Sequence, residues 1–207
     1  WDLPELPEIG SPISQSGLIS KSQRELSAEF EAKGCFFGVN GASGLIQSAI
    51  IAMANPGETI LMPRNVHISV IKTCAMQNIN PIFFDLEFSS VTGHYKPITK
   101  IWLENVFKKI NLDENKIVGI ILVSPSYHGY AGDLEPLIDF CHQKNLPVLV
   151  DEAHGSYFLF CENLDLPKPA LSSNADLVVH SLHKSLNGLT QTAVLWYKGN
   201  LINEHNL

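Results

Sequence analysis

Short apolar runs alternate along the chain with longer stretches in which apolar residues recur every three or four positions. Most of the short runs are continuously apolar, which is typical of strands buried on both faces of a sheet. The pattern predicts strands at Cys35–Val39, Thr59–Met62, Pro81–Phe84, Ile117–Val123, Pro147–Asp151, Asp176–His180 and Thr192–Tyr197.

The longer stretches between these strands have the spacing of amphipathic helices. They predict helices at Ser43–Ala54, Val66–Gln77, Pro97–Ile110 and Leu134–Asn145. Ahead of the first strand, Ser22 and Glu25 have the spacing of a capping box, which predicts a helix start, and Gly34 is a suitable helix stop. Residues 1–20 are expected to form an extended N-terminal segment.

Strands that alternate with helices predict an α/β fold, with three α/β/α layers and a mostly parallel seven-stranded sheet. Two polar segments are expected to be loops, Asn163–Ser173 and Glu87–Tyr95, the second turning at Thr92-Gly93. Ligands of such sheets bind at the carboxyl ends of the strands, so the residues that follow each strand are the candidates for function.

Composition narrows the functional classes. The chain has 207 residues, of which 45% are hydrophobic and 17% charged, which is enough for a sizeable core and excludes a disordered or coiled-coil protein. The formal net charge of −7 argues against nucleic acid as a partner. No apolar stretch reaches the roughly 20 residues of a membrane span, and the start of the sequence lacks the features of a secretory signal. We therefore expect a cytoplasmic protein with no membrane contact.

The cysteines and histidines do not indicate a metal site. Cys35, Cys74, Cys141 and Cys161 contain no C-x-x-C pair and lie in apolar stretches, so we expect small buried side chains in a reducing compartment. The spacing of His154, His180 and His183 matches no common zinc pattern.

Chemically capable residues gather directly after the predicted strands. Asp151 ends one buried strand, and Lys184 lies 33 residues further on, just past another. A carboxylate at the bottom of a pocket can keep a ring nitrogen protonated, and a lysine can form a Schiff base with an aldehyde. These are the two groups that a pyridoxal 5′-phosphate (PLP) site requires. The loop Gly41-Ala42-Ser43-Gly44 precedes a helix and offers backbone N–H groups and a hydroxyl to a phosphate.

These segments resemble the Orn/Lys/Arg decarboxylase family of fold-type I PLP-dependent enzymes, which have an aspartate aminotransferase-like large domain. The resemblance runs from about Ile19 to Tyr197. Five motifs carry it, in the family's order: Asn40-Gly41-Ala42-Ser43, Arg64-Asn65-Val66-His67-Ile68-Ser69, Asp151-Glu152-Ala153-His154-Gly155, Ser181-Leu182-His183-Lys184 and Leu189-Thr190-Gln191.

The resemblance implies a role for each matching residue. Lys184 is expected to form the Schiff base, Asp151 to pair with the pyridine nitrogen, His67 to stack on the ring, and His154 to lie near the Schiff base. The expected phosphate ligands are Ala42, Ser43, Ser181 and His183, and Ser126 is expected to face the site. The catalytic residues would then be Lys184, His154 and Asp151.

Several of these residues have structural alternatives. Lys184 would by itself be read as a surface lysine, Asp151 can cap a turn, and His154 can be a hydrogen-bonded core histidine. Ser43 can cap a helix while it also binds phosphate. Glu152 is expected to be a structural or exposed acid rather than a catalyst.

The chain departs from the family in two ways. Ala42 stands where the family has Thr, which removes one hydroxyl and would cost cofactor binding about 1–2 kcal/mol, and Ile68 replaces a Lys. The resemblance also begins partway into the family's PLP domain and stops before its small C-terminal domain. Residues 1–207 are therefore expected to be a shortened PLP-binding large domain.

The resemblance implies decarboxylation of arginine, lysine or ornithine to an amine, in polyamine biosynthesis, by a homodimer or higher homo-oligomer. The alternatives are an aminotransferase or a carbon–carbon lyase of the same fold, since one fold supports many reactions. A non-catalytic PLP-fold protein that acts as a binding partner is a third possibility.

Overall fold

The computed structural model describes residues 6, 8–10, 16–110, 115–161, 164–203 and 206–207. A seven-stranded sheet with the strand order β1-β9-β8-β7-β6-β2-β3 forms its centre. Each predicted strand is confirmed, with its boundaries within one residue of those observed. The strands are β1 (Gly34–Gly38), β2 (Thr59–Pro63), β3 (Asn80–Phe84), β6 (Ile117–Val123), β7 (Val148–Asp151), β8 (Leu177–Ser181) and β9 (Ala193–Tyr197).

The sheet is mostly parallel, as predicted. The pairs β3–β2, β2–β6, β6–β7 and β7–β8 are all parallel. Only β9 runs the other way, because it pairs in antiparallel fashion with both β8 and β1. The carboxyl ends of the parallel strands therefore lie along one edge of the sheet, where the polar segments that follow them can meet.

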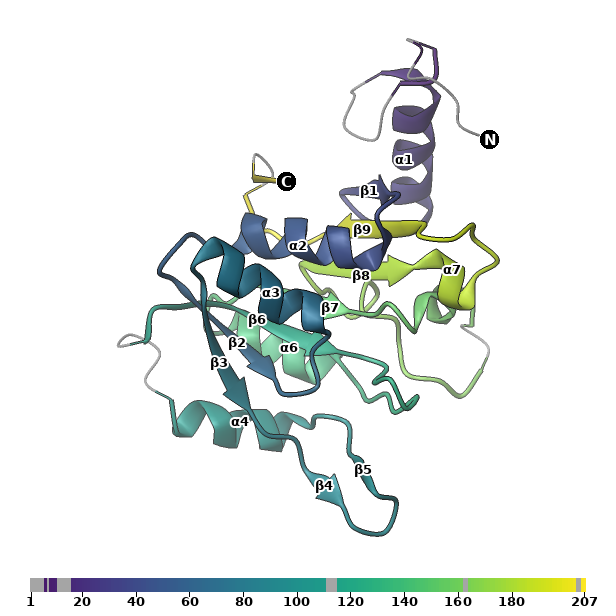
Figure 1. The fold of residues 1–207 in the computed structure, drawn as a ribbon. Coiled ribbons are helices and arrows are strands. Elements are labelled where there is room, and N and C mark those ends of the chain that lie inside the picture. The colour runs from purple at the N-terminus through teal and green to yellow at the C-terminus, as the bar shows by residue number, and fades with distance from the viewer. Residues whose placement is uncertain (1–5, 7, 11–15, 111–114, 162–163, 204–205) are drawn as a thin grey trace.

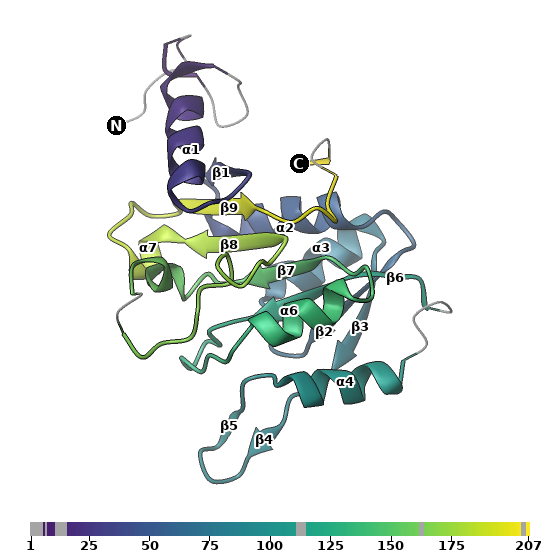
Figure 2. The same ribbon diagram turned by 180° about the vertical axis from the view of Figure 1, so that it is seen from behind.

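Helices cover both faces of the sheet and complete the predicted three-layer architecture. Figure 1 shows α2 (Gly41–Met53) and α3 (Ile68–Gln77) in front of the sheet, and Figure 2 shows α4 (Lys100–Lys108) and α6 (Glu135–His142) on the opposite face. Two separate hydrophobic clusters fill the spaces between the layers. Burial on both faces explains the continuously apolar strands.

The first helix differs from the prediction. Helix α1 (Gly17–Glu29) begins five residues before Ser22, which lies inside it, and Ser16 is the N-cap residue. The capping box and the helix stop at Gly34 are therefore wrong. Residues 17–20, expected to be extended, are helical, while residues 1–5, 7 and 11–15 of the expected extended segment lie outside the described part of the chain.

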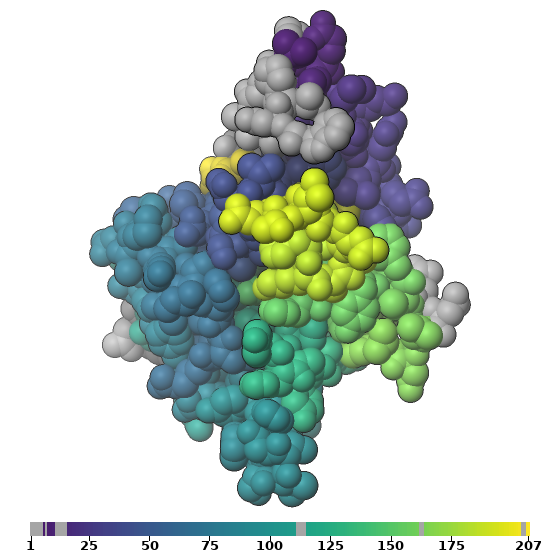
Figure 3. Space-filling model, turned by 45° about the vertical axis from the view of Figure 1, so that its right-hand side comes forward, coloured from purple at the N-terminus to yellow at the C-terminus, as the bar shows by residue number. Residues whose placement is uncertain are grey.

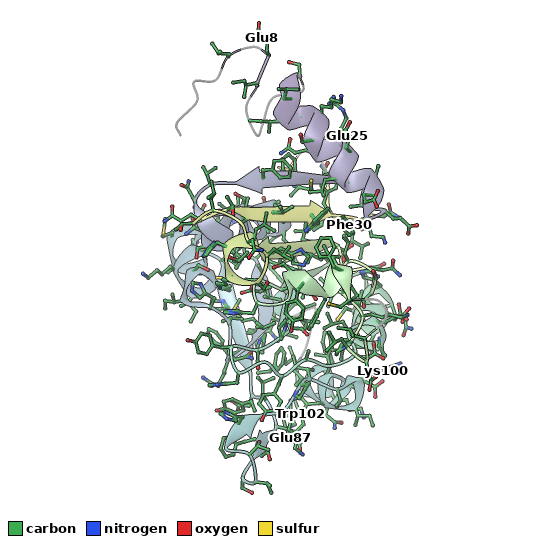
Figure 4. The ribbon with its side chains drawn as sticks, turned by 90° about the vertical axis from the view of Figure 1, so that its right-hand side faces the viewer. Glu8, Glu25, Phe30, Glu87, Lys100 and Trp102 are labelled. Carbon is green, nitrogen blue, oxygen red and sulfur yellow. The ribbon has the colours of Figure 1, made fainter. Side chains whose placement is uncertain are left out.

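The predicted loop at 87–95 is a small hairpin of β4 (Phe88–Ser89) and β5 (His94–Tyr95), and it turns where expected. The hairpin projects from the body of the molecule as a narrow teal end (Figure 3). Trp102 of α4 lies near its base in Figure 4, with its indole N–H donating to the Asp85 carbonyl at 2.7 Å. Residue 163 of the other predicted loop lies outside the described residues.

Two short helical segments complete the fold, a 3-10 helix at Ser156–Phe160 and α7 (Leu182–Ser185). Cys35, Cys74 and Cys141 are buried free thiols, as expected, while Cys161 is only half-buried. Among the described residues, every helix is too short or too polar to cross a lipid bilayer.

Candidate active site

A pocket of about 340 Å³ opens at the edge of the sheet where the parallel strands end. This volume lies in the range of small-molecule sites, roughly 300–1,000 Å³. Segments that follow β2, β6, β7 and β8 contribute to its wall, together with the start of α2. The lining residues are Ala42, Ser43, Ile46, Asn65, Val66, His67, Ile68, Val123, Tyr127, Asp151, Ala153, His154 and Lys184.

Lys184 and His154 meet in this pocket. Lys184 lies in α7, directly after β8, and its Nζ is 3.1 Å from Nε2 of His154. Burial lowers the pKa of His154, the positive charges of Lys184 and His67 lower it further, and Asp151 acts in the opposite direction. A neutral imidazole is therefore favoured, and its Nε2 accepts a hydrogen bond from the amine.

Asp151 ends β7 and is only 7% exposed. One of its carboxylate oxygens accepts a hydrogen bond from the Ala153 N–H at 3.1 Å. Burial raises its pKa, although this N–H and the positive charges of Lys184, His67 and His154 oppose the rise. The second oxygen has no hydrogen-bond partner among the described residues, and the side chain lines the pocket. The carboxyl group is therefore available to a ligand.

His67 is the N-cap residue of α3, rather than a residue inside the predicted helix. Its Nδ1 accepts a hydrogen bond from the Ser69 N–H at 3.2 Å and lies 2.8 Å from the Ser69 hydroxyl. Because both contacts involve Nδ1, Nε2 is left for the pocket that the ring lines. Capping thus fixes the orientation of the ring.

The start of α2 forms the wall that contains Ala42 and Ser43. Its N-cap residue, Asn40, makes no side-chain capping hydrogen bond. The first N–H groups of a helix have no partner within the helix and favour an anion. Gly41 has a φ of 70°, and its N–H donates to the Gln191 carbonyl at 2.8 Å. The chain after Lys184 is thereby tied to this helix start.

Three predicted site residues do not line the pocket. Ser181 is fully buried, and its hydroxyl lies 3.3 Å from Nδ1 of His183, which is exposed. Ser126 lines a neighbouring small cavity instead, where its Oγ accepts from the Tyr130 N–H. The structure thus brings together Ala42, Ser43, His67, Asp151, His154 and Lys184, and leaves these three outside the pocket.

Glu152 has a structural environment, as expected. It is fully buried, with its carboxylate 2.7 Å from Nε2 of His180 and 3.0 Å from the Ala170 N–H. Nδ1 of His180 accepts a hydrogen bond from the indole of Trp196 at 2.9 Å. This Glu152–His180–Trp196 network joins the residue that follows β7 to β8 and β9. Among the described residues, no three His, Cys, Asp or Glu side chains gather to hold a metal ion.

The sequence analysis missed two polar residues of the pocket. Tyr127 directly follows Ser126, is 82% exposed, and packs edge-to-face on His154 with ring centroids 5.6 Å apart. Asn65 belongs to a motif that the analysis quoted without giving this residue a role. For both residues, the available signal was adjacency to residues already selected.

The fold and the position of the pocket define a class: the fold is that of the fold-type I PLP-dependent enzymes. The chain superimposes on constitutive lysine decarboxylase from E. coli with a TM-score of 0.79 and 20% identity, over 96% of this chain and 29% of that one. The PLP-dependent protein YhfS from Escherichia coli gives a TM-score of 0.70 and 15% identity, over 99% of this chain and 50% of that one. These likenesses confirm the expected fold.

Sequence comparison then gives the family. The profile of the Orn/Lys/Arg decarboxylase major domain matches residues 1–207, and the chain belongs to this family. The arginine decarboxylase of Bacillus cereus is 35% identical over 98% of this chain, and that of Bacillus subtilis is 32% identical over 98%. The chain spans only 43% and 40% of the lengths of these two curated relatives.

Proposed function

We propose that this chain is the PLP-binding part of an enzyme that decarboxylates a basic amino acid. One observation carries the proposal: an amine, an imidazole and a buried carboxyl group, those of Lys184, His154 and Asp151, line a single pocket at the carboxyl ends of the strands. The membership of the decarboxylase family supports this reaction over the other reactions of the fold.

The residues present fit PLP. The carboxyl group of Asp151 is nearly inaccessible to water, and one of its oxygens has no partner among the described residues, so an N–H donor with positive charge suits it. At another wall, the uncapped start of α2 and the hydroxyl of Ser43 suit a phosphate. The Ala42 side chain offers no hydroxyl, so we assign it a backbone contact only.

In this proposal, PLP supplies an aldehyde for covalent attachment and a ring that accepts the electron pair of the broken Cα–carboxylate bond. Lys184 provides the amine that holds the cofactor. Asp151 would keep the ring nitrogen protonated, and the imidazole of His67 would lie against the ring. His154 accepts a hydrogen bond from the Lys184 amine, which keeps Nζ directed into the pocket. Either of these two side chains can deliver a proton to Cα.

Arginine, lysine and ornithine are the proposed substrates, and the two arginine decarboxylases compared above favour arginine. We also propose that the enzyme works in the cytoplasm as a homodimer or higher homo-oligomer and contributes to polyamine formation. The support for these points is the family alone.

The test is borohydride reduction of the 207-residue chain with PLP, followed by peptide mapping. We expect a pyridoxyl group on the peptide that contains Lys184, and none in Lys184→Ala. Lys72→Ala is the matched control, because Lys72 is an exposed lysine on the neighbouring helix α3 and should leave the adduct intact. An adduct that persists in Lys184→Ala, or no adduct in the folded wild-type chain, would contradict the proposal.

Reaction type needs a second measurement. In the full-length protein, release of CO₂ from carboxyl-labelled arginine, lysine or ornithine identifies decarboxylation. Conversion of the labelled amino acid to its keto acid with retention of the label, coupled to amination of an added acceptor keto acid, would instead indicate an aminotransferase.

A further inference from the structure

Asn65 occupies the wall between the active-site pocket and its small neighbour. It lies in the turn that joins β2 to α3, which two backbone hydrogen bonds hold in place, from Arg64 to Phe84 and from Val66 to Pro63. The residue lines both the pocket of about 340 Å³ and the adjoining cavity of about 20 Å³. The position is therefore well fixed and faces a ligand site.

The amide of Asn65 is unsatisfied. It makes no hydrogen bond to any residue that the structure describes, and its Oδ1 is buried from water without a partner. Exchanging Oδ1 and Nδ2 by rotation of the amide leaves the same conclusion, since one end of the group is buried in either case. Nearly all buried polar groups have a partner, so this exception requires an explanation.

The neighbouring groups do not supply a hydrogen-bond partner for the Asn65 amide. Arg64 is held by Asp85, with Nε 2.6 Å from the carboxylate, and the ring nitrogen Nδ1 of His67 is occupied by Ser69. The wall beside Asn65 is otherwise apolar where Val66 and Val123 line the pocket. A leucine would fill this position without leaving a buried polar atom unpaired, so stability does not account for the asparagine.

We infer that Asn65 is a ligand-binding residue of this pocket, whose amide oxygen Oδ1 accepts a hydrogen bond from an N–H or O–H group of the bound ligand. The inference rests on the proposed function, in which both the cofactor and its amino-acid substrate carry such donors. Occupation of the pocket would give Oδ1 the partner that the protein does not supply. Asn65 lies two residues before His67, which lines the same pocket.

The experiment compares wild type with Asn65→Leu in two ways. Urea unfolding of the chain without ligand should show a free energy of unfolding that is equal or higher in the variant, because no hydrogen bond is lost. PLP affinity, followed by absorbance, should fall by about tenfold or more if the donor to Oδ1 belongs to the cofactor. If the donor belongs to the substrate, PLP affinity stays constant and the affinity of the PLP-loaded chain for arginine falls by that factor.

Asn80→Leu is the matched control, because the amide of Asn80 has a partner, the Gly57 carbonyl at 3.1 Å, away from the pocket. It should leave both affinities unchanged. A loss of stability in ligand-free Asn65→Leu, or two unchanged affinities, would overturn the inference. If wild type takes no PLP adduct, the proposed function fails and this inference fails with it. An adduct with unchanged affinities in the variant overturns the inference alone.

Discussion

The N–H group of Gly41 donates a hydrogen bond to the carbonyl of Gln191 at 2.8 Å, and both residues have left-handed backbone conformations, with φ of 70° and 68°. The bond connects two segments that are 150 positions apart in sequence. One segment begins α2, and the other follows Lys184. The relative position of the amine and the helix start therefore depends on two backbone conformations that most residues avoid.

Gly41→Ala should lower the free energy of unfolding by about 1–2 kcal/mol, the cost of a left-handed conformation for a residue with a Cβ. Steric collision adds nothing, because no atom lies within 4 Å of the added Cβ. Gln191→Gly should leave stability within about 1 kcal/mol of wild type, since relief of strain offsets the extra freedom of glycine when unfolded. Urea unfolding of the two variants measures both effects. Equal stabilities for wild type and Gly41→Ala would contradict the role of this conformation.

Asp151→Asn should stabilise the ligand-free chain at pH 7, although it removes the proposed partner of the cofactor. Burial raises the pKa of Asp151 above its ordinary value of 3.8, so its ionised form is disfavoured in the folded protein. The asparagine retains an oxygen for the Ala153 N–H and carries no charge. The gain should be about 1.4 kcal/mol for each unit by which the pKa is raised.

The pH dependence has a definite sign. A raised pKa means that the folded state binds more protons than the unfolded state between 3.8 and the raised value, so wild-type stability falls as pH rises through that window. Asp151→Asn lacks this loss of stability. The difference in free energy of unfolding between the variant and wild type should therefore grow as pH rises through the window and then remain constant. Urea unfolding at a series of pH values measures it. A variant less stable than wild type at pH 7 would mean that the cations near Asp151 outweigh its burial.

The Glu152–His180–Trp196 network should be a major source of stability near the pocket. Trp196→Phe leaves Nδ1 of His180 without its donor, and an unsatisfied buried group costs about 1–3 kcal/mol. Glu152→Ala leaves both the Ala170 N–H and Nε2 of His180 without an acceptor, so we expect a loss of about 3–5 kcal/mol. Thermal and urea unfolding of the variants give the values.

Asp85→Ala is the control for this network. Its carboxylate pairs with Arg64 at 2.6 Å, but the two side chains are 76% and 62% exposed. Exposed ion pairs contribute roughly 0–1 kcal/mol, so this variant should stay close to wild type despite the short distance. Comparable losses of stability in Asp85→Ala and Glu152→Ala would contradict the claim that burial determines how much each carboxylate contributes.

Although the edge strands β1 and β3 are only partly buried, the five inner strands could be predicted because they are buried on both faces, which produces a continuously apolar run that few other structures require. The start of α1 could not be predicted from the sequence, because the buried face of this helix is polar. Its buried residues are Ser20, Gln23 and Ser27, and the Ser27 hydroxyl donates to the Gln23 carbonyl at 2.6 Å. Hydrophobic periodicity carries no signal for such a helix. Gly34 was interpreted as a helix stop, yet it opens β1, where a Cβ would collide with the ring of Tyr197.

The candidate site was predictable to a similar extent. Position after a strand brings a residue to the correct edge of the sheet, and this placed Asp151, His154 and Lys184 in one pocket. It does not determine the direction of the side chain. Ser181 still belongs to β8 and is buried beside His183, while Ser126 is directed to the neighbouring cavity. Those directions depend on local turns that the sequence pattern does not specify.

His154 provides a direct test of the electrostatics of the pocket. Burial is the main cause of its lowered pKa, and Lys184 and Asp151 act on it in opposite directions. Lys184→Met removes a positive charge and the hydrogen-bond donor to Nε2, which lies 3.1 Å from Nζ in wild type. Both losses remove support for the neutral imidazole, so the pKa of His154 should rise. Asp151→Asn removes the negative charge that favours the protonated ring, so the pKa should fall.

Titration of the histidine ring signals by NMR, with His154→Gln to assign the resonance, measures both shifts in the ligand-free chain. Lys72→Met is the control, since Lys72 is exposed on α3 and is not among the groups that shift this pKa. Opposite displacements in the two variants require that amine, imidazole and carboxyl group share one electrostatic environment. Displacements in the same direction, or none, would mean that burial alone sets the pKa of His154 and that these three side chains do not act together.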